Sequence, residues 1–398
     1  MKELSRVFSA VQPSATLAVN SKFKAMKAQG IPVVGFGAGE PDFDTPEYIK
    51  EAAISAIRGG QTKYTPTAGT MEVRKAIAFR IKEDTGVEYE PDAIVVSSGA
   101  KACLHAVFAA LLNPGDEVIV PAPYWVSYPE QIRMNGGVPV IVTAGEEQEF
   151  KITAAQLEAA ITPKTKAFVL NNPCNPTGMI LSKEDLLALC DVCVRHDLYI
   201  ISDEIYYRLC YDGHIFTSVP SLGEDIKEHC ILINGASKSY AMTGWRCGYA
   251  ACGDKKIAKV LTNTLSHSMG CIGAMNQAAL AAALTGPQDS VDAMRTVFEE
   301  RRNYLVERMN TIDGVSCIKP EGAFYVMMNI EKLIGRRFGD RIIHDADDFA
   351  MAFLEIGLVA VVSCCAFGAP NFVRWTYATD MDTIREGLDR LEAFLKAE

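Results

Sequence analysis

Short apolar runs alternate with longer helix-like segments between residues 93 and 252, and this alternation constrains the fold more than any other feature. Seven runs are predicted to be strands: 93–96, 117–120, 138–142, 167–170, 198–201, 231–233 and 248–252. Short buried strands separated by helices are typical of a mostly parallel sheet that helices cover on both faces. We therefore expect an α/β fold with a seven-stranded, mostly parallel sheet flanked by helices.

The chain after about residue 286 has a different pattern. Long helices are predicted at 291–309, 347–356 and 382–396, and strands at 324–328, 359–362 and 372–376. This mixture predicts a smaller α+β domain. A single core stops growing at about 250–300 residues, so 398 residues favour two domains. We expect a large domain at 45–285, and a small domain formed by 286–398 with an N-terminal arm, 1–44.

Composition excludes several classes of protein. The formal net charge of −10 argues against a nucleic-acid partner. No apolar run approaches the roughly 20 residues that span a bilayer, and no apolar segment follows the first residues, so we expect a cytoplasmic protein without a membrane span. The twelve cysteines are then expected to be free thiols. Cys190 and Cys193, near His196, are expected in the core, and no metal site is predicted.

A loop of small and hydroxyl residues joins the predicted strands 231–233 and 248–252. It contains Ser237, Lys238, Ser239 and Arg246. A lysine amine becomes a nucleophile toward carbonyls when its surroundings lower its pKa. An arginine can hold a phosphate through two parallel hydrogen bonds. The pair suggests a Schiff-base lysine and pyridoxal phosphate, while an ordinary surface loop is the alternative.

Other unusual residues follow predicted strands, and ligands of parallel sheets bind beyond the carboxyl ends of strands. Asp203 would need a partner for its buried charge, such as a protonated pyridine nitrogen. Gly99 precedes a helix whose first amides favour a phosphate. Trp125 could stack on a flat ring, and Asn175 lies in a proline-rich loop that could aim its amide. Arg374, on a late strand, could clamp a carboxylate. Each residue alone also fits a purely structural role.

Taken together, these residues resemble the class I aminotransferases among the fold-type I pyridoxal-phosphate enzymes, over essentially the whole chain. The resemblance rests on Gly39-Glu40-Pro41-Asp42-Phe43, Lys63-Tyr64, Asn172-Pro173-Cys174-Asn175-Pro176-Thr177-Gly178, Ser202-Asp203-Glu204-Ile205-Tyr206, Ser237-Lys238, Gly244-Trp245-Arg246 and Gly322-Ala323-Phe324-Tyr325. Within the family, Pro13-Ser14-Ala15-Thr16, Gly99-Ala100-Lys101 and Pro123-Tyr124-Trp125-Val126-Ser127-Tyr128-Pro129-Glu130 look like bacterial aspartate aminotransferases.

The resemblance implies roles around the cofactor ring. Lys238 would form the Schiff base and then move a proton. Asp203 would keep the pyridine nitrogen protonated, so that the ring can accept electrons. Asn175 and Tyr206 would bond the phenolic oxygen of the ring, and Trp125 would stack on it.

The resemblance also implies a phosphate site and a homodimer. Gly99, Ala100, Ser237 and Arg246 would hold the phosphate, with Lys101 beside them. Tyr64 would reach this phosphate from the second subunit, so the active sites would lie at the subunit interface.

For the substrate, the resemblance implies that Arg374 clamps the α-carboxylate and that the loop of Gly39 closes over it, beside Trp125 and Asn175. Lys101, with Thr16 and Ser14, would bind the second carboxylate. The expected reaction moves the amino group of L-aspartate to 2-oxoglutarate in two half-reactions. Three alternatives remain: prephenate, aromatic or broader specificity; another fold-type I reaction, such as a C–S β-lyase or a decarboxylase; and a regulator with an aminotransferase-like sensor domain, which the charge and the short N-terminal segment disfavour.

Two positions depart from the family pattern. Gly235 stands where many relatives carry a serine that contacts the phosphate, and Ser237 is expected to compensate. The loop that contains Cys364 and Cys365 replaces a Pro-Gly-containing loop near the substrate mouth of relatives. The two cysteines are expected to be small-residue filler of this loop.

Overall fold

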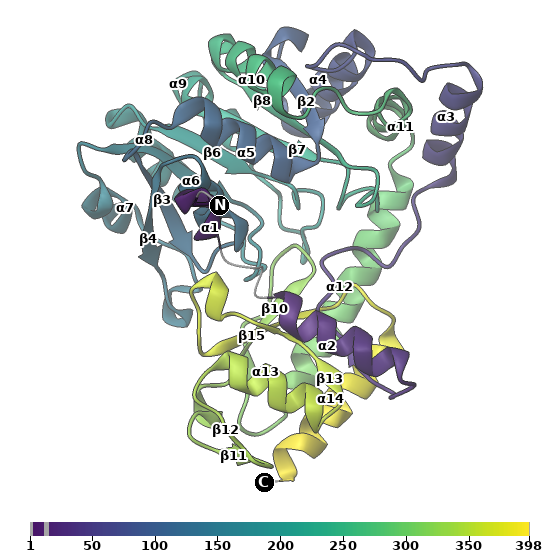
Figure 1. The fold of residues 1–398 in the computed structure, drawn as a ribbon, viewed down its shortest axis with the longest axis vertical. Coiled ribbons are helices and arrows are strands. Elements are labelled where there is room, and N and C mark those ends of the chain that lie inside the picture. The colour runs from purple at the N-terminus through teal and green to yellow at the C-terminus, as the bar shows by residue number, and fades with distance from the viewer. Residues whose placement is uncertain (1–2, 12–15, 398) are drawn as a thin grey trace.

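The computed structural model describes residues 3–11 and 16–397, and its centre is the expected seven-stranded sheet (Figure 1). The strand order is β2-β8-β7-β6-β5-β3-β4. Strand β8 runs antiparallel to both neighbours, and the other pairs are parallel. The bounds are β2 (Ile94–Ser98), β3 (Glu117–Ala122), β4 (Val138–Thr143), β5 (Thr165–Asn171), β6 (Tyr199–Asp203), β7 (Cys230–Gly235) and β8 (Cys247–Cys252). The predicted fold class is confirmed.

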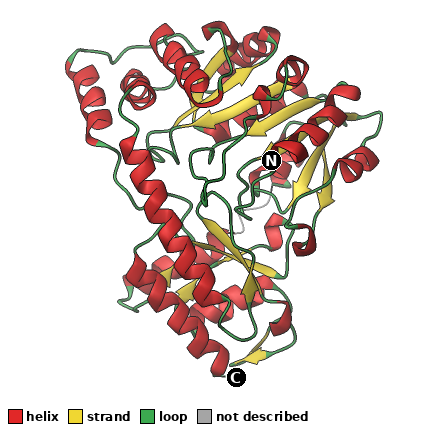
Figure 2. Ribbon diagram, turned by 180° about the vertical axis from the view of Figure 1, so that it is seen from behind, coloured by secondary structure: helices red, strands yellow, loops and turns green. Residues whose placement is uncertain are grey.

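Helices cover both faces of this sheet, as the view from behind also shows (Figure 2). Successive strand residues point to opposite faces, so Phe168 packs in one core and Val169 in the other. One face carries α5 (Ala100–Leu111), α6 (Ser127–Met134) and α10 (Lys255–Ser268). The other carries α4 (Met71–Thr85), α7 (Ala154–Ala160), α8 (Lys183–Arg195), α9 (Glu224–His229) and α11 (Ala274–Thr285), with α3 (Glu47–Arg58) packed on α11. The apolar residues of these strands are therefore buried on both sides.

A second, smaller sheet lies below the large one in Figure 1, and the long helix α12 (Asp289–Met309) runs between the two parts. The strand order of the smaller sheet is β14-β15-β10-β9, and each pair of neighbouring strands is antiparallel. The remaining elements are α1 (Arg6–Ser9), α2 (Thr16–Ala28), β1 (Val34–Gly35), β9 (Ser316–Cys317), β10 (Tyr325–Asn329), β11 (Arg337–Phe338), β12 (Arg341–Ile342), α13 (Ala346–Glu355), β13 (Val359–Ala360), β14 (Val362–Ser363), β15 (Phe372–Thr376) and α14 (Met381–Lys396). The buried rings of Phe298, Phe353 and Trp375 belong to the core of this part.

The single strand predicted at 359–362 is wrong. The structure divides it into β13, which pairs with β1, and β14, which pairs with β15. All four residues from 359 to 362 are buried, so their apolar pattern does not reveal where one sheet ends and another begins.

Two further observations bear on the expectations from composition. Within the described part of the chain, no helix is both long and apolar enough to cross a membrane. All twelve cysteines lie in this part and are free thiols, and Cys190 and Cys193 lie on the buried face of α8 in the core.

Candidate active site

A cavity of about 560 Å³ lies where the carboxyl ends of β5, β6 and β7 meet the smaller sheet. Most of the predicted site residues line it: Gly39, Ala100, Lys101, Trp125, Asn175, Asp203, Tyr206, Ser237, Lys238, Arg246 and Arg374. These residues come from positions 39 to 374, so the fold brings together residues that are far apart in the sequence. Their convergence is the expected placement for a site in a parallel sheet.

Asp203 ends β6 and is almost completely buried. Its carboxylate accepts a hydrogen bond of 2.6 Å from the hydroxyl of Tyr128 and one of 3.3 Å from the amide of Ile205. Burial raises the pKa of Asp203 to about 6, although the Tyr128 hydrogen bond opposes this shift. A buried carboxylate of this kind favours a cationic partner in the cavity.

Asn175 is held in place from two sides. Its backbone amide donates to the side-chain oxygen of Asn171, whose own amide group donates to the carbonyl of Asp203. The side-chain oxygen of Asn175 accepts a hydrogen bond of 2.9 Å from Arg374. The amide nitrogen of Asn175 is the remaining donor of that side chain, so this residue can bond an anionic oxygen in the cavity.

Arg374 lies on β15 and is buried between two aromatic rings. Its guanidinium carbon lies 4.2 Å from the ring centre of Tyr325 and 5.3 Å from that of Phe367. Its Nε is buried without a hydrogen-bond partner among the described residues. The hydroxyl of Tyr325 lies 3.0 Å from that of Tyr206. The rings fix the plane of the guanidinium, which suits it to hold a planar carboxylate in the cavity.

Lys238 lies in the loop between β7 and β8, half-buried, and its amine donates to the carbonyl of Gly39. Burial lowers its pKa to about 8, and the positive charge of Arg374 adds to the shift. At pH 7 about a tenth of the amine is therefore neutral, and the neutral amine is the form that can act as a nucleophile or base.

The first turn of α5 and Arg246 form a compact cationic corner. Strand β8 lies directly against this turn, because an ideal Cβ at Gly248 would come within 2.3 Å of the amide nitrogen of Ala100. An ideal Cβ at Gly99 would come within 2.5 Å of the guanidinium of Arg246, so Gly99, which has a φ of +83°, admits Arg246 because it has no side chain. Gly99 thus precedes the predicted phosphate site, while Ala100 and Ser237 line the cavity. The first amides of a helix have no intrahelical acceptor and favour an anion.

Gly235 is required by packing, which explains the departure from relatives with serine. It ends β7, and an ideal Cβ there would lie 2.6 Å from the carbonyl oxygen of Cys247 and 3.0 Å from Gly248 Cα. Both are backbone atoms of β8, so a side chain at this position would displace a central strand.

Gly235→Ser is therefore expected to destabilise the protein by about 1–3 kcal/mol, the usual range for overpacking, and not to tighten phosphate binding. Urea unfolding and a phosphate titration of the cofactor-free protein would measure both effects. Gly244→Ser is a matched control, because an ideal Cβ at Gly244 meets no atom within 4 Å. Equal stability of the two variants would contradict the packing argument.

Lys101 lies at the edge of the cavity on α5, with its ammonium 4.9 Å from the ring centre of Trp125. Partial desolvation and the charge of Arg246 lower its pKa. Trp125 is half-buried, and its ring meets that of Tyr128 edge-on at 5.3 Å. A cation beside an aromatic wall is suited to bind a carboxylate at this end of the cavity.

Four predicted residues are not among those that line this cavity, and one of them, Gly99, directly precedes the lining residue Ala100. Tyr64 lines a different cavity with Lys63 and Gln277, and its side chain is fully exposed. Ser14 lies outside the described residues, and Thr16 begins α2 but its side chain is also outside the description.

Tyr128, Asn171 and Tyr325 were missed as site residues by sequence reasoning. Tyr128 lies in the first turn of α6 and donates a hydrogen bond to Asp203. Asn171 is the last residue of β5, which is a position where a polar residue could have been noticed. Tyr325 belongs to a motif quoted for the resemblance, but a role toward Arg374 was not assigned to it.

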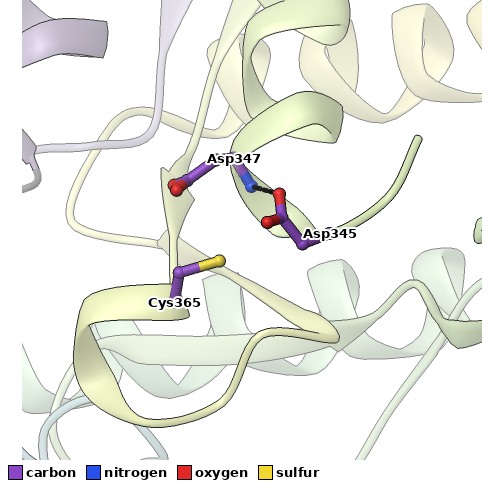
Figure 3. Close-up of side chains that lie close together, drawn as sticks. All are labelled: Asp345, Asp347 and Cys365. Carbon is purple, nitrogen blue, oxygen red and sulfur yellow. Dashed lines mark hydrogen bonds between the residues drawn. The ribbon is translucent and has the colours of Figure 1, made fainter. Parts of the chain in front are cut away.

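The loop with the two cysteines reaches the cavity through Phe367. Cys364 is buried and Cys365 is half-buried, which agrees with their interpretation as filler. Cys365 points toward Asp345 and Asp347 at the start of α13, and the three possible ligand atoms lie within 4.8 Å of one another (Figure 3). The Asp345 carboxylate accepts from the amide of Asp347 at 2.9 Å, so it caps the helix. This capping accounts for the position of Asp345 without a metal.

The residues present fit pyridoxal phosphate. The Arg246 and α5 corner suits a phosphate, buried Asp203 suits a protonated ring nitrogen, and Asn175 offers a donor to a phenolic oxygen. Lys238, with its lowered pKa, suits attachment to the aldehyde. The arrangement can thus bind an amino acid between Lys101 and Arg374 and move a proton at Lys238.

Comparison with known proteins agrees with this site. The sequence model of the family described as Aminotransferase class I and II matches residues 31–391. The chain belongs to this family, which implies pyridoxal phosphate as the cofactor.

The similarity extends over whole chains. An aspartate aminotransferase of Geobacillus stearothermophilus is 47% identical over 100% of both chains. An aspartate/prephenate aminotransferase of Cereibacter sphaeroides is 45% identical over 99% of both chains. The crystal structure of an aspartate aminotransferase from Rhizobium meliloti superposes with a TM-score of 0.96, at 40% identity and 100% coverage of both chains.

Proposed function

We propose that the protein is a pyridoxal-phosphate-dependent aspartate aminotransferase, which moves the amino group of L-aspartate to 2-oxoglutarate and forms oxaloacetate and L-glutamate. One observation carries this proposal. Two cations, Arg374 of the smaller sheet and Lys101 of α5, line the cavity that also contains Lys238. A substrate with a carboxylate at each end satisfies both cations, whereas a monocarboxylic amino acid leaves Lys101 without a partner.

The proposed roles follow from the contacts of each side chain. Arg374 binds the α-carboxylate, and the neutral amine of Lys238 takes the proton from the substrate Cα. When bound, the cofactor supplies an electron-accepting ring. Asp203 keeps a proton on the ring nitrogen, and Tyr128 holds Asp203 in position.

The remaining roles concern the ring and the phosphate. Asn175 and Tyr206 bond the phenolic oxygen, and Trp125 stacks on the ring. Gly99, Ala100, Ser237 and Arg246 hold the phosphate, and the loop of Gly39 covers the substrate. The names of the Geobacillus and Rhizobium relatives support the choice of aspartate, and the name of the Cereibacter relative keeps prephenate as a second candidate acceptor.

Product analysis tests the proposal. Purified protein with pyridoxal phosphate, L-aspartate and 2-oxoglutarate is expected to form oxaloacetate and L-glutamate in equal amounts. Release of ammonia, or formation of alanine from aspartate, would instead indicate a lyase or a decarboxylase. A panel of aspartate, phenylalanine, alanine and prephenate as substrates, compared by kcat/KM, separates aspartate specificity from broader alternatives.

Lys101→Ala is expected to lower kcat/KM for aspartate by roughly 10–100-fold, since a hydrogen-bonded charge contributes about 1.5–3 kcal/mol. The value for alanine is expected to change by less than about twofold, because alanine has no second carboxylate. The control is Lys183→Ala, whose side chain is exposed on α8 and does not line the cavity. Equal losses for aspartate and alanine would refute the role of Lys101.

We also propose a homodimer in which Tyr64 reaches the phosphate of the other subunit. The fully exposed Tyr64 ring supports this, because an aromatic ring left in water is typical of an interface residue. Light scattering should give twice the mass of the chain. Mixed dimers of Lys238→Ala and Tyr64→Ala subunits should regain one complete site and part of the activity, whereas a monomer would regain none.

The division into domains and the location are proposals of the same kind. Residues 45–285 surround the large sheet, and 286–398 with 1–44 form the smaller part. An expressed 45–285 fragment should then show a cooperative thermal transition. The buried free thiols fit a reducing compartment, so we propose the cytoplasm, which cell fractionation would test.

A further inference from the structure

Tyr206 and Tyr325 form a pair of buried tyrosines that joins the two parts of the molecule at the cavity of Lys238. Tyr206 follows β6 of the large sheet, and Tyr325 begins β10 of the smaller sheet. Their rings meet edge-on with centres 5.8 Å apart, and their hydroxyl oxygens lie 3.0 Å from each other. Both residues line the cavity, and at most 3% of either is exposed. The proposed roles assign no task to the hydroxyl of Tyr325.

The strand register places Tyr325 against the arginine that would bind the α-carboxylate. Tyr325 pairs with Thr376 across β10 and β15, and Arg374 lies two residues before Thr376. The side chains of Tyr325 and Arg374 are therefore diagonal neighbours on one face of the smaller sheet. The guanidinium carbon of Arg374 lies 4.2 Å from the ring centre of Tyr325. Tyr325 thus contacts this cation with its ring and Tyr206 with its hydroxyl.

The hydrogen-bonding capacity of the two hydroxyls determines their direction of donation. Among the described residues, each hydroxyl has only the other as a hydrogen-bond partner. A phenol hydroxyl donates one hydrogen bond and can accept others. Burial raises the pKa of Tyr206 well above its usual value and also raises the pKa of Tyr325, so both hydroxyls keep their protons at neutral pH. If Tyr206 donates to an anionic oxygen in the cavity, its bond with Tyr325 persists only when Tyr325 is the donor.

The loop of Gly39 covers the hydroxyl of Tyr325. An ideal Cβ at Gly39 would lie 3.3 Å from this hydroxyl oxygen, and the carbonyl of Gly39 accepts from the amine of Lys238. The hydroxyl is therefore enclosed by protein, where the local dielectric is low. Hydrogen bonds in a chain polarise and strengthen one another in such surroundings. A donor behind Tyr206 would accordingly make the Tyr206 hydroxyl a stronger donor toward the cavity.

We propose that Tyr325 is a positioning residue for the cofactor and that it acts through Tyr206. The Tyr325 hydroxyl donates to Tyr206, and the Tyr206 hydroxyl donates to the phenolic oxygen of bound pyridoxal phosphate. The ring of Tyr325 supports Arg374 at the same time. This proposal rests on the proposed function and adds to it a relay of two hydroxyls. One side chain then supports both the group that bonds the cofactor and the group that binds the α-carboxylate.

The relay has a measurable effect on the bound cofactor. Donors to the phenolic oxygen favour its deprotonated, anionic form, so they lower the pKa of the proton shared between this oxygen and the nitrogen of Lys238. Removing a donor raises that pKa. A substitution at Tyr325 leaves unchanged the other charged or titratable groups around the tyrosine pair and Lys238, which are Glu40, Tyr128, Asp203, Arg246, Arg374 and Tyr377.

Tyr325→Phe tests the relay, because it removes one hydroxyl and keeps the ring. The absorption of the bound cofactor would be titrated against pH in the wild-type protein and the variant, without substrate. We expect the midpoint of Tyr325→Phe to lie about half a unit higher, as for the loss of one ordinary hydrogen bond. Tyr206→Phe removes the direct donor to an anionic oxygen and is expected to raise the midpoint by about one unit or more.

The double variant Tyr206→Phe/Tyr325→Phe shows whether Tyr325 acts through Tyr206. Once the Tyr206 hydroxyl is absent, the relay is already broken, so the second substitution should move the midpoint by less than about 0.2 units. Tyr377→Phe is the matched control. It removes a buried hydroxyl that bonds the carbonyls of Gly322 and Ala323 and that does not belong to a residue lining the cavity. Its midpoint should equal that of the wild-type protein.

Kinetics separate the ring of Tyr325 from its hydroxyl. Tyr325→Phe keeps an aromatic face beneath Arg374, so KM for aspartate is expected to stay within about twofold of the wild-type value. Tyr325→Leu removes the ring as well and is expected to raise KM about tenfold, because a buried cation loses its aromatic partner. The midpoint of its cofactor titration should match that of Tyr325→Phe.

The outcomes separate the relay from the proposed function. An unchanged midpoint in Tyr325→Phe, or an equal shift with and without the Tyr206 hydroxyl, would overturn the relay while aspartate transamination by the wild-type protein still stands. A shift of the same size in Tyr377→Phe would also overturn it, because the effect would then be general to buried hydroxyls of this core. Expected midpoints in a protein that does not transaminate aspartate would support the relay and refute the proposed function. If the wild-type protein binds no pyridoxal phosphate, both proposals fail.

Discussion

Replacing Lys238 by alanine is expected to lower kcat for transamination by about 10⁴-fold or more. General acid–base catalysis alone contributes roughly 10²–10⁴-fold, and this variant also loses the covalent attachment of the cofactor. No neighbouring side chain can replace the amine. The other cations of the cavity are Lys101, Arg246 and Arg374, of which the two arginines stay protonated and Lys101 lies against Trp125 on α5.

The measurement combines steady-state rates with borohydride reduction and mass spectrometry. In wild-type protein, reduction should fix the cofactor on the peptide that contains Lys238, and in Lys238→Ala no peptide should carry it. Ser239→Ala is the matched control, because Ser239 is the adjacent buried residue and its hydroxyl has no partner among the described residues. Normal transamination by Lys238→Ala, with a native circular dichroism spectrum, would show that the proposed chemistry is wrong.

The large sheet could be predicted because its strands carry their own signal. Residues such as Phe168 and Val169 are apolar in succession, which indicates burial on both faces, and helices separate each strand from the next. The smaller sheet carries a weaker signal. The buried run at 359–362 serves two sheets, and the choice between them depends on the partners β1 and β15, which are distant in the sequence.

Residues of the candidate site could be predicted from the sequence where a polar side chain lies at the end of a buried strand. Asp203 and Asn175 are polar residues beside buried strands, so their position is unusual enough to be noticed. Tyr128 is different, because a tyrosine on the buried face of an amphipathic helix is ordinary in the core. Only the three-dimensional packing of α6 against the sheet directs its hydroxyl to Asp203.

Gly235 illustrates what sequence patterns omit. The need for glycine at 235 arises from the backbone of β8, which no local pattern of β7 records. Packing and hydrogen-bond direction are properties of the folded chain, so they require the structure.

Asp203→Asn is expected to reduce kcat/KM strongly. The variant removes the carboxylate that would pair with the protonated ring nitrogen in a buried site. Breaking a buried ion pair costs about 3–5 kcal/mol, which corresponds to roughly 10²–10⁴-fold in rate. The Tyr128 hydroxyl can still donate to the amide oxygen of the substituted side chain, so the loss would reflect charge more than geometry.

The same substitution is expected to stabilise the cofactor-free protein at neutral pH. Burial raises the pKa of Asp203 from 3.8 to about 6, so the ionised carboxylate is unfavourable in the folded state above that pH. At about 1.4 kcal/mol per pKa unit, the penalty approaches about 3 kcal/mol. The folded protein binds this proton more tightly than the unfolded chain. The advantage of Asp203→Asn is therefore full above about pH 6 and declines as pH falls toward 3.8, and it is lost below 3.8, where both states of the wild-type protein are protonated.

Urea unfolding of the two cofactor-free proteins between about pH 4.5 and 7.5 would measure this difference. Asp212→Asn is the control with the opposite sign. Slight burial raises the pKa of Asp212, but its ion pairs with Arg302 and Lys319 lower this pKa overall. Replacing Asp212 should therefore destabilise the protein. A stability difference between wild type and Asp203→Asn that does not change with pH would mean that Asp203 is not held as a costly buried charge. An Asp203→Asn protein that is more stable yet nearly inactive would identify this carboxylate as a group kept for catalysis at the expense of stability.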